Sequence, residues 1–238
     1  MLFDFWHQLA VGETIHPADR PILERYAGVG AFNTRVPPGH ISGPLIKSPV
    51  VVCYLNPGFG PEDHQLAKDA TARAALFRQM NGLDPFPLEF RCWKKWFHGL
   101  VRSIGLPLEE LANKVSIFNV CAYASPNADH ISDALMKCLP SAQIARDYLH
   151  RVLLPAAQRD ERFVVIGRGA WAWRVDKSAK IKNVKFTPNP RGPYLGNKLG
   201  SNIRKWLDSR SILPSNETLN RDAREASHAG RLQNPRAG

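Results

Sequence analysis

The sequence has no apolar run long enough to cross a membrane as a helix. Its longest runs, such as residues 49–55, fall far short of the roughly 20 residues that a membrane-spanning helix needs. The N-terminus, MLFDFWHQLA, carries Asp4 and no basic residue before its apolar stretch, unlike a secretory signal. We therefore expect a cytoplasmic protein that has no membrane partner.

Cysteine is also scarce. The four cysteines, Cys53, Cys92, Cys121 and Cys138, are widely spaced, and the sequence has no C-x-x-C or His pair that would indicate a zinc site. An iron–sulfur cluster usually includes a close pair of ligands, which is missing here. Cys53 and Cys121 lie in apolar runs, where a free thiol behaves as a small hydrophobic side chain. We expect buried thiols there, and neither a metal nor a cofactor.

Acidic residues are few relative to basic ones. Lys and Arg number 32 against 21 Asp and Glu, which gives a formal net charge of +11 at pH 7. The segment 166–210 alone holds eleven Lys and Arg against two Asp, a net charge of +9. Because this segment has so few acidic residues, most of its Lys and Arg side chains lack a local salt-bridge partner. This favours a phosphate-binding surface over a charged face that is only solvated. Nucleic acid is the first partner to expect.

Hydrophobic residues make up 44% of the 238 residues, enough for a sizeable core. Four short runs, at 49–55, 115–120, 162–167 and 183–187, are almost continuously apolar, as expected of strands covered on both faces. Between and after them, apolar residues recur at helical spacing in 90–104, 144–153 and 199–207. Strands that alternate with helices predict an α/β fold: a three-layer α/β/α sandwich around a roughly four-stranded parallel sheet.

The two ends of the chain differ from its centre. Residues 1–45 contain scattered Pro and Gly and no sustained period, which predicts an irregular N-terminal lead-in that contributes no chemistry. Residues 215–238 are polar with only two Leu, which predicts a flexible tail. The folded domain is then expected in residues 46–214.

Three asparagines lie at the expected strand ends. Asn56 follows the first strand, Asn119 ends the second and Asn189 follows the fourth. In a parallel α/β sheet the ligand crevice lies beyond the carboxyl ends of the strands, so the three are expected around one crevice. An Asn amide both donates and accepts, which suits reading a nucleobase edge or orienting a water. Each Asn alone is more often a turn former, but their joint placement favours a site.

Four segments resemble, in order, the motifs of the uracil-DNA glycosylase superfamily. YLNPG (54–58) resembles the first motif of the mismatch-specific and single-strand-selective monofunctional branches, and FNVCAYAS (118–125) resembles the segment whose Asn reads uracil. FVVIGRGAWAW (163–173) is similar to the strand and Gly-Arg turn that follow. TPNPRGPYLGNKLG (187–200) is similar to the last motif, in which a Pro-x-Pro loop enters the damaged duplex. The resemblance spans residues 49–207.

The resemblance implies a monofunctional glycosylase of base-excision repair that flips uracil, or a related damaged pyrimidine, out of single- or double-stranded DNA and hydrolyses its N-glycosidic bond. Asn119 would hold the uracil edge, and Asn56 would orient a water toward C1′. Arg191 would be either a wedge that fills the vacated stack or an ordinary phosphate contact. Such an enzyme is expected to be a nucleoid-associated monomer. Substrate contacts are expected from Leu55, Pro57, Gly58, Phe59, Phe86 and Asn119, and DNA contacts from Arg168, Arg191, Gly192 and Lys198.

The sequence departs from the family pattern at Thr187, where many members have a His. A Thr187 hydroxyl or the Asn189 amide would donate only a neutral hydrogen bond to the departing uracil anion, worth roughly half a charge-assisted one. Glu62 and Asp63 are candidates for accepting the proton of the water, although acids at such a junction commonly cap the next helix. The aromatic that stacks on the base is expected to be Phe59 or Phe86, with core packing as the alternative for each.

Two other functions compete with this interpretation. The missing His favours a non-catalytic or weakly active nucleic-acid-binding protein that has kept the glycosylase fold. A small α/β hydrolase or nucleotidase is the other, but no G-x-S-x-G elbow, Walker loop or acidic metal cluster supports it.

Overall fold

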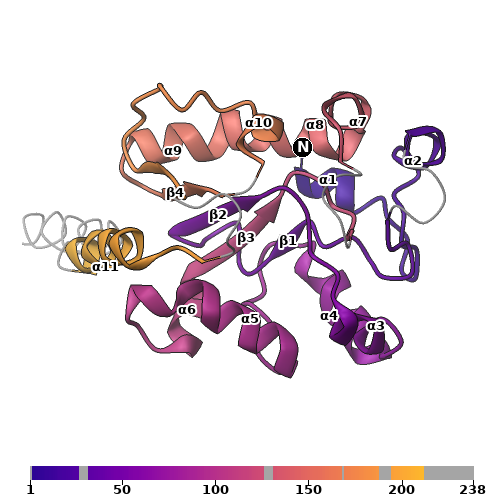
Figure 1. The fold of residues 1–238 in the computed structure, drawn as a ribbon, viewed down its shortest axis with the longest axis horizontal. Helices are drawn as coiled ribbons and strands as arrows, with labels where there is room; N and C mark the ends of the chain where they lie inside the picture. Colours follow the sequence, from indigo (N-terminus) through magenta and orange to yellow (C-terminus); the bar gives the residue numbers. More distant parts are fainter. Residues whose placement is uncertain (1, 27–31, 126–130, 168, 188–193, 212–238) are drawn as a thin grey trace, which may run out of the picture.

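The structure, a computed structural model, describes residues 2–26, 32–125, 131–167, 169–187 and 194–211. Its centre is a five-stranded sheet with the strand order β1-β3-β2-β4-β5 (Figure 1). The strands are β1 (Ile41–Ser42), β2 (Val50–Tyr54), β3 (Val115–Asn119), β4 (Phe163–Ile166) and β5 (Val184–Phe186). β3, β2, β4 and β5 are parallel, and β1 pairs antiparallel with β3.

The four expected parallel strands are confirmed. Every residue of β2, β3 and β4 is buried, which explains why their sequences are nearly continuous in apolar residues rather than alternating. The additional strand, β1, has two residues and no sequence pattern of its own. It lies at the sheet edge, where Ile41 is opposite Phe118 of β3.

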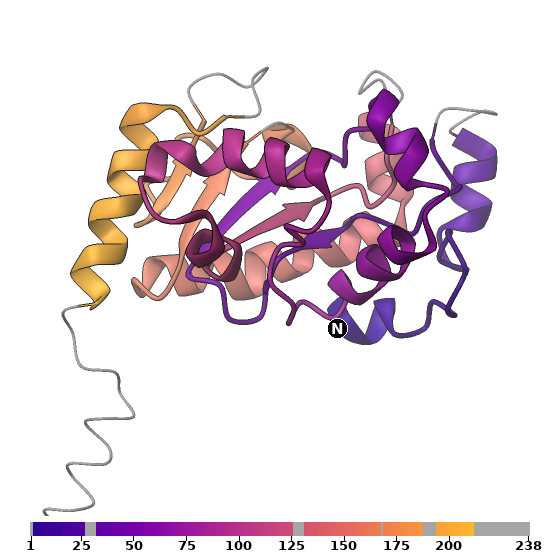
Figure 2. The same cartoon turned by 90° about the horizontal axis from the view of Figure 1, so that it is seen from below.

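Helices cover both faces of the sheet, which makes the three layers of an α/β/α sandwich (Figures 1 and 2). One face packs against α1 (Leu2–Trp6), α7 (Asp133–Cys138), α8 (Pro140–Tyr148), α9 (Leu154–Gln158) and α10 (Ala170–Trp173). The other face packs against α5 (Arg91–Val101), α6 (Leu108–Lys114) and α11 (Asn197–Ser211). The short helices α3 (Pro61–Leu66) and α4 (Ala70–Gln79) lie beside α5.

Alternate residues of β2 enter opposite cores. Val51 and Cys53 belong to the core under α8, whereas Val50, Val52 and Tyr54 belong to the core under α5. This is the two-residue period of a strand that is buried on both faces. Cys53 and Cys121 are both buried free thiols, as their apolar surroundings predicted.

Helical spacing predicted the longer helices well. The 90–104 stripe forms α5 and the 3-10 turn η1 (Arg102–Ile104), and the 199–207 stripe is the buried face of α11. The 144–153 stripe runs through α8 into a π-helical turn, η3 (Leu149–Leu153). A π turn holds an extra residue and shifts the buried face, so Val152 is 41% exposed instead of buried. Pro155 follows this turn and has no N–H to continue an α-helical ladder.

The N-terminal segment has more regular structure than the expected irregular lead-in. It contains α1, α2 (Arg20–Tyr26) and β1, and α1 contributes Leu2, Phe5 and Trp6 to the core. Buried hydrogen bonds hold it in place: Tyr123 Oη donates to Asp19 over 2.7 Å, and Ser141 N donates to the same carboxylate over 3.0 Å. The expected polar tail, 215–238, lies outside the described residues.

No helix in the described part of the chain is both long and apolar enough to span a membrane. Within those same ranges, no cluster of three or more His, Cys, Asp or Glu side chains is arranged to hold a metal ion.

Candidate functional site

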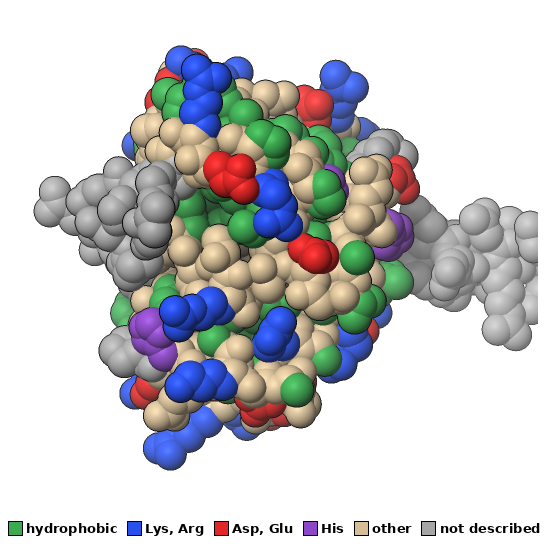
Figure 3. Space-filling view, turned by 90° about the vertical axis from the view of Figure 1, so that its right-hand side faces the viewer, with side chains coloured by type: hydrophobic (Ala, Val, Ile, Leu, Met, Phe, Trp, Pro, Cys, Tyr) green, Lys and Arg blue, Asp and Glu red, His purple; other side chains and the backbone are tan. Residues whose placement is uncertain are grey.

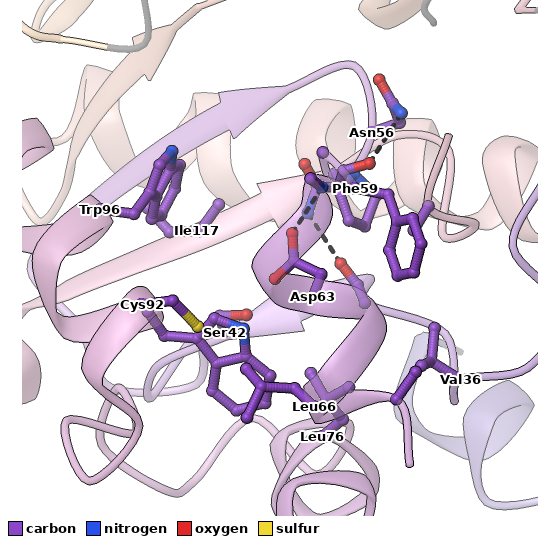
Figure 4. Close-up of a pocket in the computed structure, with 18 of the residues that line it drawn as sticks. Val36, Ser42, Asn56, Phe59, Asp63, Leu66, Leu76, Cys92, Trp96 and Ile117 are labelled. Atoms are coloured by element: carbon purple, nitrogen blue, oxygen red, sulfur yellow. Dashed lines mark hydrogen bonds between the residues drawn. The ribbon is translucent and has the colours of Figure 1, made fainter. Parts of the chain in front are cut away.

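A cavity of about 850 Å³ opens beside the carboxyl ends of β2 and β3 (Figure 4). Its lining comes from several parts of the chain: the 36–42 segment, the loop after β2 with α3, Leu76 of α4, residues 86–87, the first half of α5, and β3 with the segment that follows it. On the side of the molecule seen in Figure 3, the surface has a hollow with hydrophobic side chains in it, and both basic and acidic side chains lie around it. The cavity is where the parallel-sheet rule places a ligand.

Asn119 lines this cavity from the end of β3 and is only 4% exposed. Its side-chain Nδ2 donates to the backbone carbonyl of Gly39 over 2.7 Å, and its backbone N donates to the carbonyl of His40 over 2.9 Å. A carbonyl only accepts, so the bond to Gly39 fixes which end of the amide is NH₂. No described residue donates to Asn119 Oδ1, which leaves that oxygen as an acceptor for a ligand.

Asn56 lines the same cavity from the loop after β2. Its Nδ2 donates to the carbonyl of Pro57 over 2.8 Å (Figure 4), which again directs the amide oxygen away from the backbone contact. Ser125 N donates to the same carbonyl over 3.3 Å, and Gly58 bridges to Ser125. The loop after β2 is therefore tied to the segment after β3, and the structure brings the Asn56 and Asn119 motifs together.

Gly39 touches both motifs. A Cβ atom on Gly39 would lie 2.8 Å from Pro57 Cγ, closer than side-chain carbons approach one another. Only glycine allows this backbone to pass so near the Asn-Pro-Gly loop while its carbonyl accepts from Asn119.

Aromatic side chains form much of the wall. Phe86 is 5% exposed and stacks on Phe97, with ring centroids 4.1 Å apart and an interplanar angle of 12°. Phe59 is half-buried and meets His64 edge to face at 4.4 Å. Trp96 is 39% exposed and meets Tyr54 at 6.4 Å. Phe86 thus packs in the core as well as lining the cavity, whereas Phe59 belongs to no core cluster of the described residues.

The two acids after the loop differ in what they contact. Asp63 Oδ2 accepts from Gly60 N over 2.7 Å, and Asp63 N donates back to the Gly60 carbonyl over 3.1 Å. This reciprocal pair caps α3, so Asp63 has the capping role that was the alternative to catalysis. Glu62 is exposed and lines the cavity. Burial, with the carboxylates of Asp63 and Glu62 nearby, raises the pKa of the Cys92 thiol in the same wall.

Leu55 of the first motif packs against the turn after β4. Gly169 has a φ of +79°, and a Cβ there would lie 2.8 Å from Leu55 Cβ. A Cβ on Gly167 would similarly meet the Tyr54 ring at 2.7 Å. Both glycines of the Gly-Arg-Gly turn are therefore explained by close packing and conformation. Arg168, the candidate DNA contact between them, lies outside the described residues.

The last motif is described only in part. Thr187 follows β5, is 8% exposed, and donates its backbone N–H to the Ile166 carbonyl over 3.0 Å; it is not among the described residues that line the cavity. Lys198 is exposed in the first turn of α11 and is also not in the lining. Asn189, Arg191 and Gly192 lie outside the described residues.

Sequence reasoning missed two parts of the site. Val36, Pro37, Gly39 and Ser42 line the cavity, although residues 1–45 were expected to contribute no chemistry. The only signal in their sequence was Pro37-Pro38-Gly39, which predicts a turn. A turn signal does not indicate that Gly39 contacts Asn119, 80 positions away. Trp96 was also missed because the neighbouring Trp93 and Phe97 fit the apolar stripe of α5 and Trp96 does not.

Comparisons with protein-family models, with curated proteins and with solved structures find no match to this chain. The resemblance to the uracil-DNA glycosylase superfamily therefore rests on the motifs themselves, and the function must be argued from the site.

Proposed function

We propose that this protein is a monofunctional uracil-DNA glycosylase that hydrolyses the N-glycosidic bond of uracil, or of a related damaged pyrimidine, in DNA. The observation that carries the proposal is the bond between Asn119 Nδ2 and the Gly39 carbonyl. It holds the Asn119 amide in one orientation in the wall of a cavity that Asn56 also lines.

The fixed amide supplies selectivity for uracil. With one N–H bound to Gly39, Asn119 still has a second N–H for uracil O4, and its Oδ1 can accept from uracil N3–H. Cytosine presents the opposite pattern, an acceptor at N3 and a donor at C4. With cytosine bound, the Asn119 N–H would face the cytosine amino group, and Asn119 Oδ1 would face the acceptor N3. Each buried group left unpaired in this way costs roughly 1–3 kcal/mol.

Flipping is needed because Asn119 is only 4% exposed, so a base that stays in a duplex cannot bring its edge to the amide. Unstacking a nucleotide costs a few kcal/mol. Contact with the aromatic wall offsets this cost, since a base stacked on an aromatic side chain is worth about 1–3 kcal/mol. Phe59 and Trp96 both line the cavity without being fully buried, so both can offer ring surface to a base.

Asn56 would position the attacking water. Its Oδ1 can accept from water because its Nδ2 is engaged by Pro57. An amide is a poor base, so its contribution is orientation of the water toward C1′ while the bond to the departing uracil lengthens. The growing charge at the sugar is stabilised by the DNA phosphates and the uracil anion. Without a His in the last motif, we expect a modest rate.

The test is single-turnover release of uracil from a single-stranded and a duplex oligonucleotide, with EDTA present and alkaline cleavage of the product. We expect release by the native protein and about a hundredfold lower rate for Asn56→Ala, as for loss of one positioned catalytic group. Asn113→Ala is the control, because Asn113 is exposed on α6 and bonds only to Glu109 among its described neighbours. Loss of activity in EDTA, or an unchanged Asn56→Ala rate, would overturn the mechanism.

A second candidate function is DNA binding without turnover. Thr187 favours it, since Thr187 replaces the usual His and is not among the described lining residues. Uracil-dependent binding of DNA together with no uracil release at any enzyme concentration would support this candidate instead.

A further inference from the structure

α5, which lines the cavity through Trp93 and Trp96, carries several exposed positive charges. Arg91, Lys94, Lys95 and, just after the helix, Arg102 are all exposed, and α5 contains no acidic residue. None of these four side chains forms an ion pair with any residue that the structure describes. Nothing in the proposed chemistry at Asn56 and Asn119 uses them.

Two exposed aromatic rings lie along the same helix. Trp96 is 39% exposed and lines the cavity, and Tyr194 is 52% exposed. Tyr194 packs over Gly99: a Cβ on Gly99 would lie 2.8 Å from Tyr194 Cε1. The Arg102 guanidinium lies over the Tyr194 ring, 5.9 Å from its centroid. Glycine at position 99 thus makes room for the tyrosine ring against the helix.

The spacing places these groups in one row. Residues 96, 99 and 102 are three apart, so each is a neighbour of the next on the helix surface, and the row turns by about a third of a turn between Trp96 and Arg102. From Trp96 to Arg102 the helix rises about 9 Å, which matches two or three stacked nucleotides at about 3.4 Å each. The row begins at the cavity wall and ends near the first turn of α11, where Gly200 packs on Ser103 and Lys198 adds another exposed positive charge.

We propose that this row (Trp96, Tyr194 and Arg102 with Lys95, which is four positions before Gly99, hereafter the α5 track) binds single-stranded DNA that leads out of the cavity. Exposed aromatic faces stack on unpaired bases, while unpaired Lys and Arg neutralise the phosphates between them. In a duplex the bases are stacked on one another, so they present no free face to the Trp96 and Tyr194 rings. The α5 track therefore distinguishes single strands from duplex, and it does so without any catalytic step.

The experiment measures binding of a fluorescently labelled oligodeoxycytidylate, whose bases do not match the proposed uracil site, and of a uracil-free duplex to the intact protein by anisotropy. We expect the single strand to bind more tightly. Trp96→Leu should weaken single-strand binding about tenfold, in line with one lost base stack. Tyr26→Ala is the matched aromatic control, since Tyr26 is 44% exposed on α2, away from α5.

Charge is tested separately with Lys95→Gln and Arg102→Gln. Each should lower the slope of log affinity against log salt by about 0.7 for each lost phosphate contact with a single strand. Lys47→Gln is the control, because Lys47 is exposed before β2, at the amino end of the parallel strands. These two charge variants keep the test decisive even if Trp96→Leu folds poorly.

The proposal is overturned if duplex binds as tightly as single strand, or if the charge variants bind the single strand like the native protein. Because the strands contain no uracil, these outcomes are independent of glycosylase activity. An active glycosylase can fail this test, and a protein without uracil release can pass it.

Discussion

The side-chain amide of Asn119 and the backbone carbonyl of Gly39 are joined by a 2.7 Å hydrogen bond, although the residues lie 80 positions apart. Gly39 also packs against Pro57 so closely that a Cβ would stand 2.8 Å from its ring. One glycine therefore sets both the orientation of the amide at the end of β3 and the position of the loop after β2. The proposed reading of the base depends on that arrangement.

Asn119→Asp tests the orientation of the amide. A carboxylate has no N–H for the Gly39 carbonyl or for uracil O4, so it faces two acceptors without a donor. We expect single-turnover uracil release to fall by about a hundredfold or more. A carboxylate can accept from the cytosine amino group, so release of cytosine from a matched oligonucleotide should be measured alongside. Unchanged uracil release would show that Asn119 does not read the base.

Gly39→Ala tests the contact between the two motifs. The added methyl must displace Pro57 or the backbone of the 36–42 segment, and either shift moves a wall of the cavity. We expect uracil release to fall at least tenfold, while overpacking lowers the free energy of unfolding by about 1–3 kcal/mol. Kinetics and urea unfolding on the same preparation separate the two effects. A loss of stability with full activity would make Gly39 purely structural.

The sequence predicted the sheet well because its strands are buried on both faces. In Val50–Tyr54 every side chain contacts a core, so the run is apolar throughout and easy to recognise. In a parallel sheet the ligand crevice lies beyond the carboxyl ends of the strands, which predicted that Asn56 and Asn119 lie at the same edge although they are 63 positions apart. In the structure both line one cavity.

Other features of the structure do not correspond to any periodic pattern of apolar residues in the sequence. The 36–42 segment is held by long-range bonds, such as Gly39 N to the Ala122 carbonyl at 2.8 Å, and these do not depend on any side-chain pattern. The exposure of Val152 follows from a π turn, which a pattern with a 3.6-residue period cannot anticipate. Trp171 and Trp173 both follow β4 and are two positions apart, yet only Trp173 is buried.

Phe59 and Phe86 should respond differently to truncation, and the difference identifies the stacking ring. Phe86 is 5% exposed and stacks on Phe97, so Phe86→Ala should lower the free energy of unfolding by about 3–5 kcal/mol. Phe59 is outside the described core clusters, so Phe59→Ala should change stability by less than about 1 kcal/mol.

If Phe59 stacks on the flipped base, Phe59→Ala should lower kcat/KM for uracil release about tenfold, since one lost stack is worth about 1–3 kcal/mol. Thermal unfolding measures the stability of both variants, and steady-state kinetics measures their kcat/KM for uracil release. Unchanged kcat/KM in Phe59→Ala would leave Phe86 or Trp96 as the ring that contacts the base.

His40 gives the fold a defined sensitivity to acid. It precedes β1 and is fully buried between aromatic rings, 5.1 Å from Trp6 and 4.8 Å from Phe118 between ring centroids. Neither of its ring nitrogens has a hydrogen-bond partner among the described residues. Burial lowers the pKa of this imidazole from 6.5 to about 3. The folded protein therefore keeps His40 neutral where the unfolded chain would protonate it.

Between pH 6.5 and about 3 the unfolded chain binds more protons at His40 than the folded protein does. The free energy of unfolding must therefore fall as the pH decreases through this window, by at most about 1.4 kcal/mol per pH unit from this residue. His40→Leu removes the titration and an unpaired buried polar group, so the variant should gain stability relative to the native protein as the pH falls. Urea unfolding of both proteins at pH 7.5, 6 and 5 measures the difference. A difference that stays constant with pH would mean that His40 takes up its proton equally in both states.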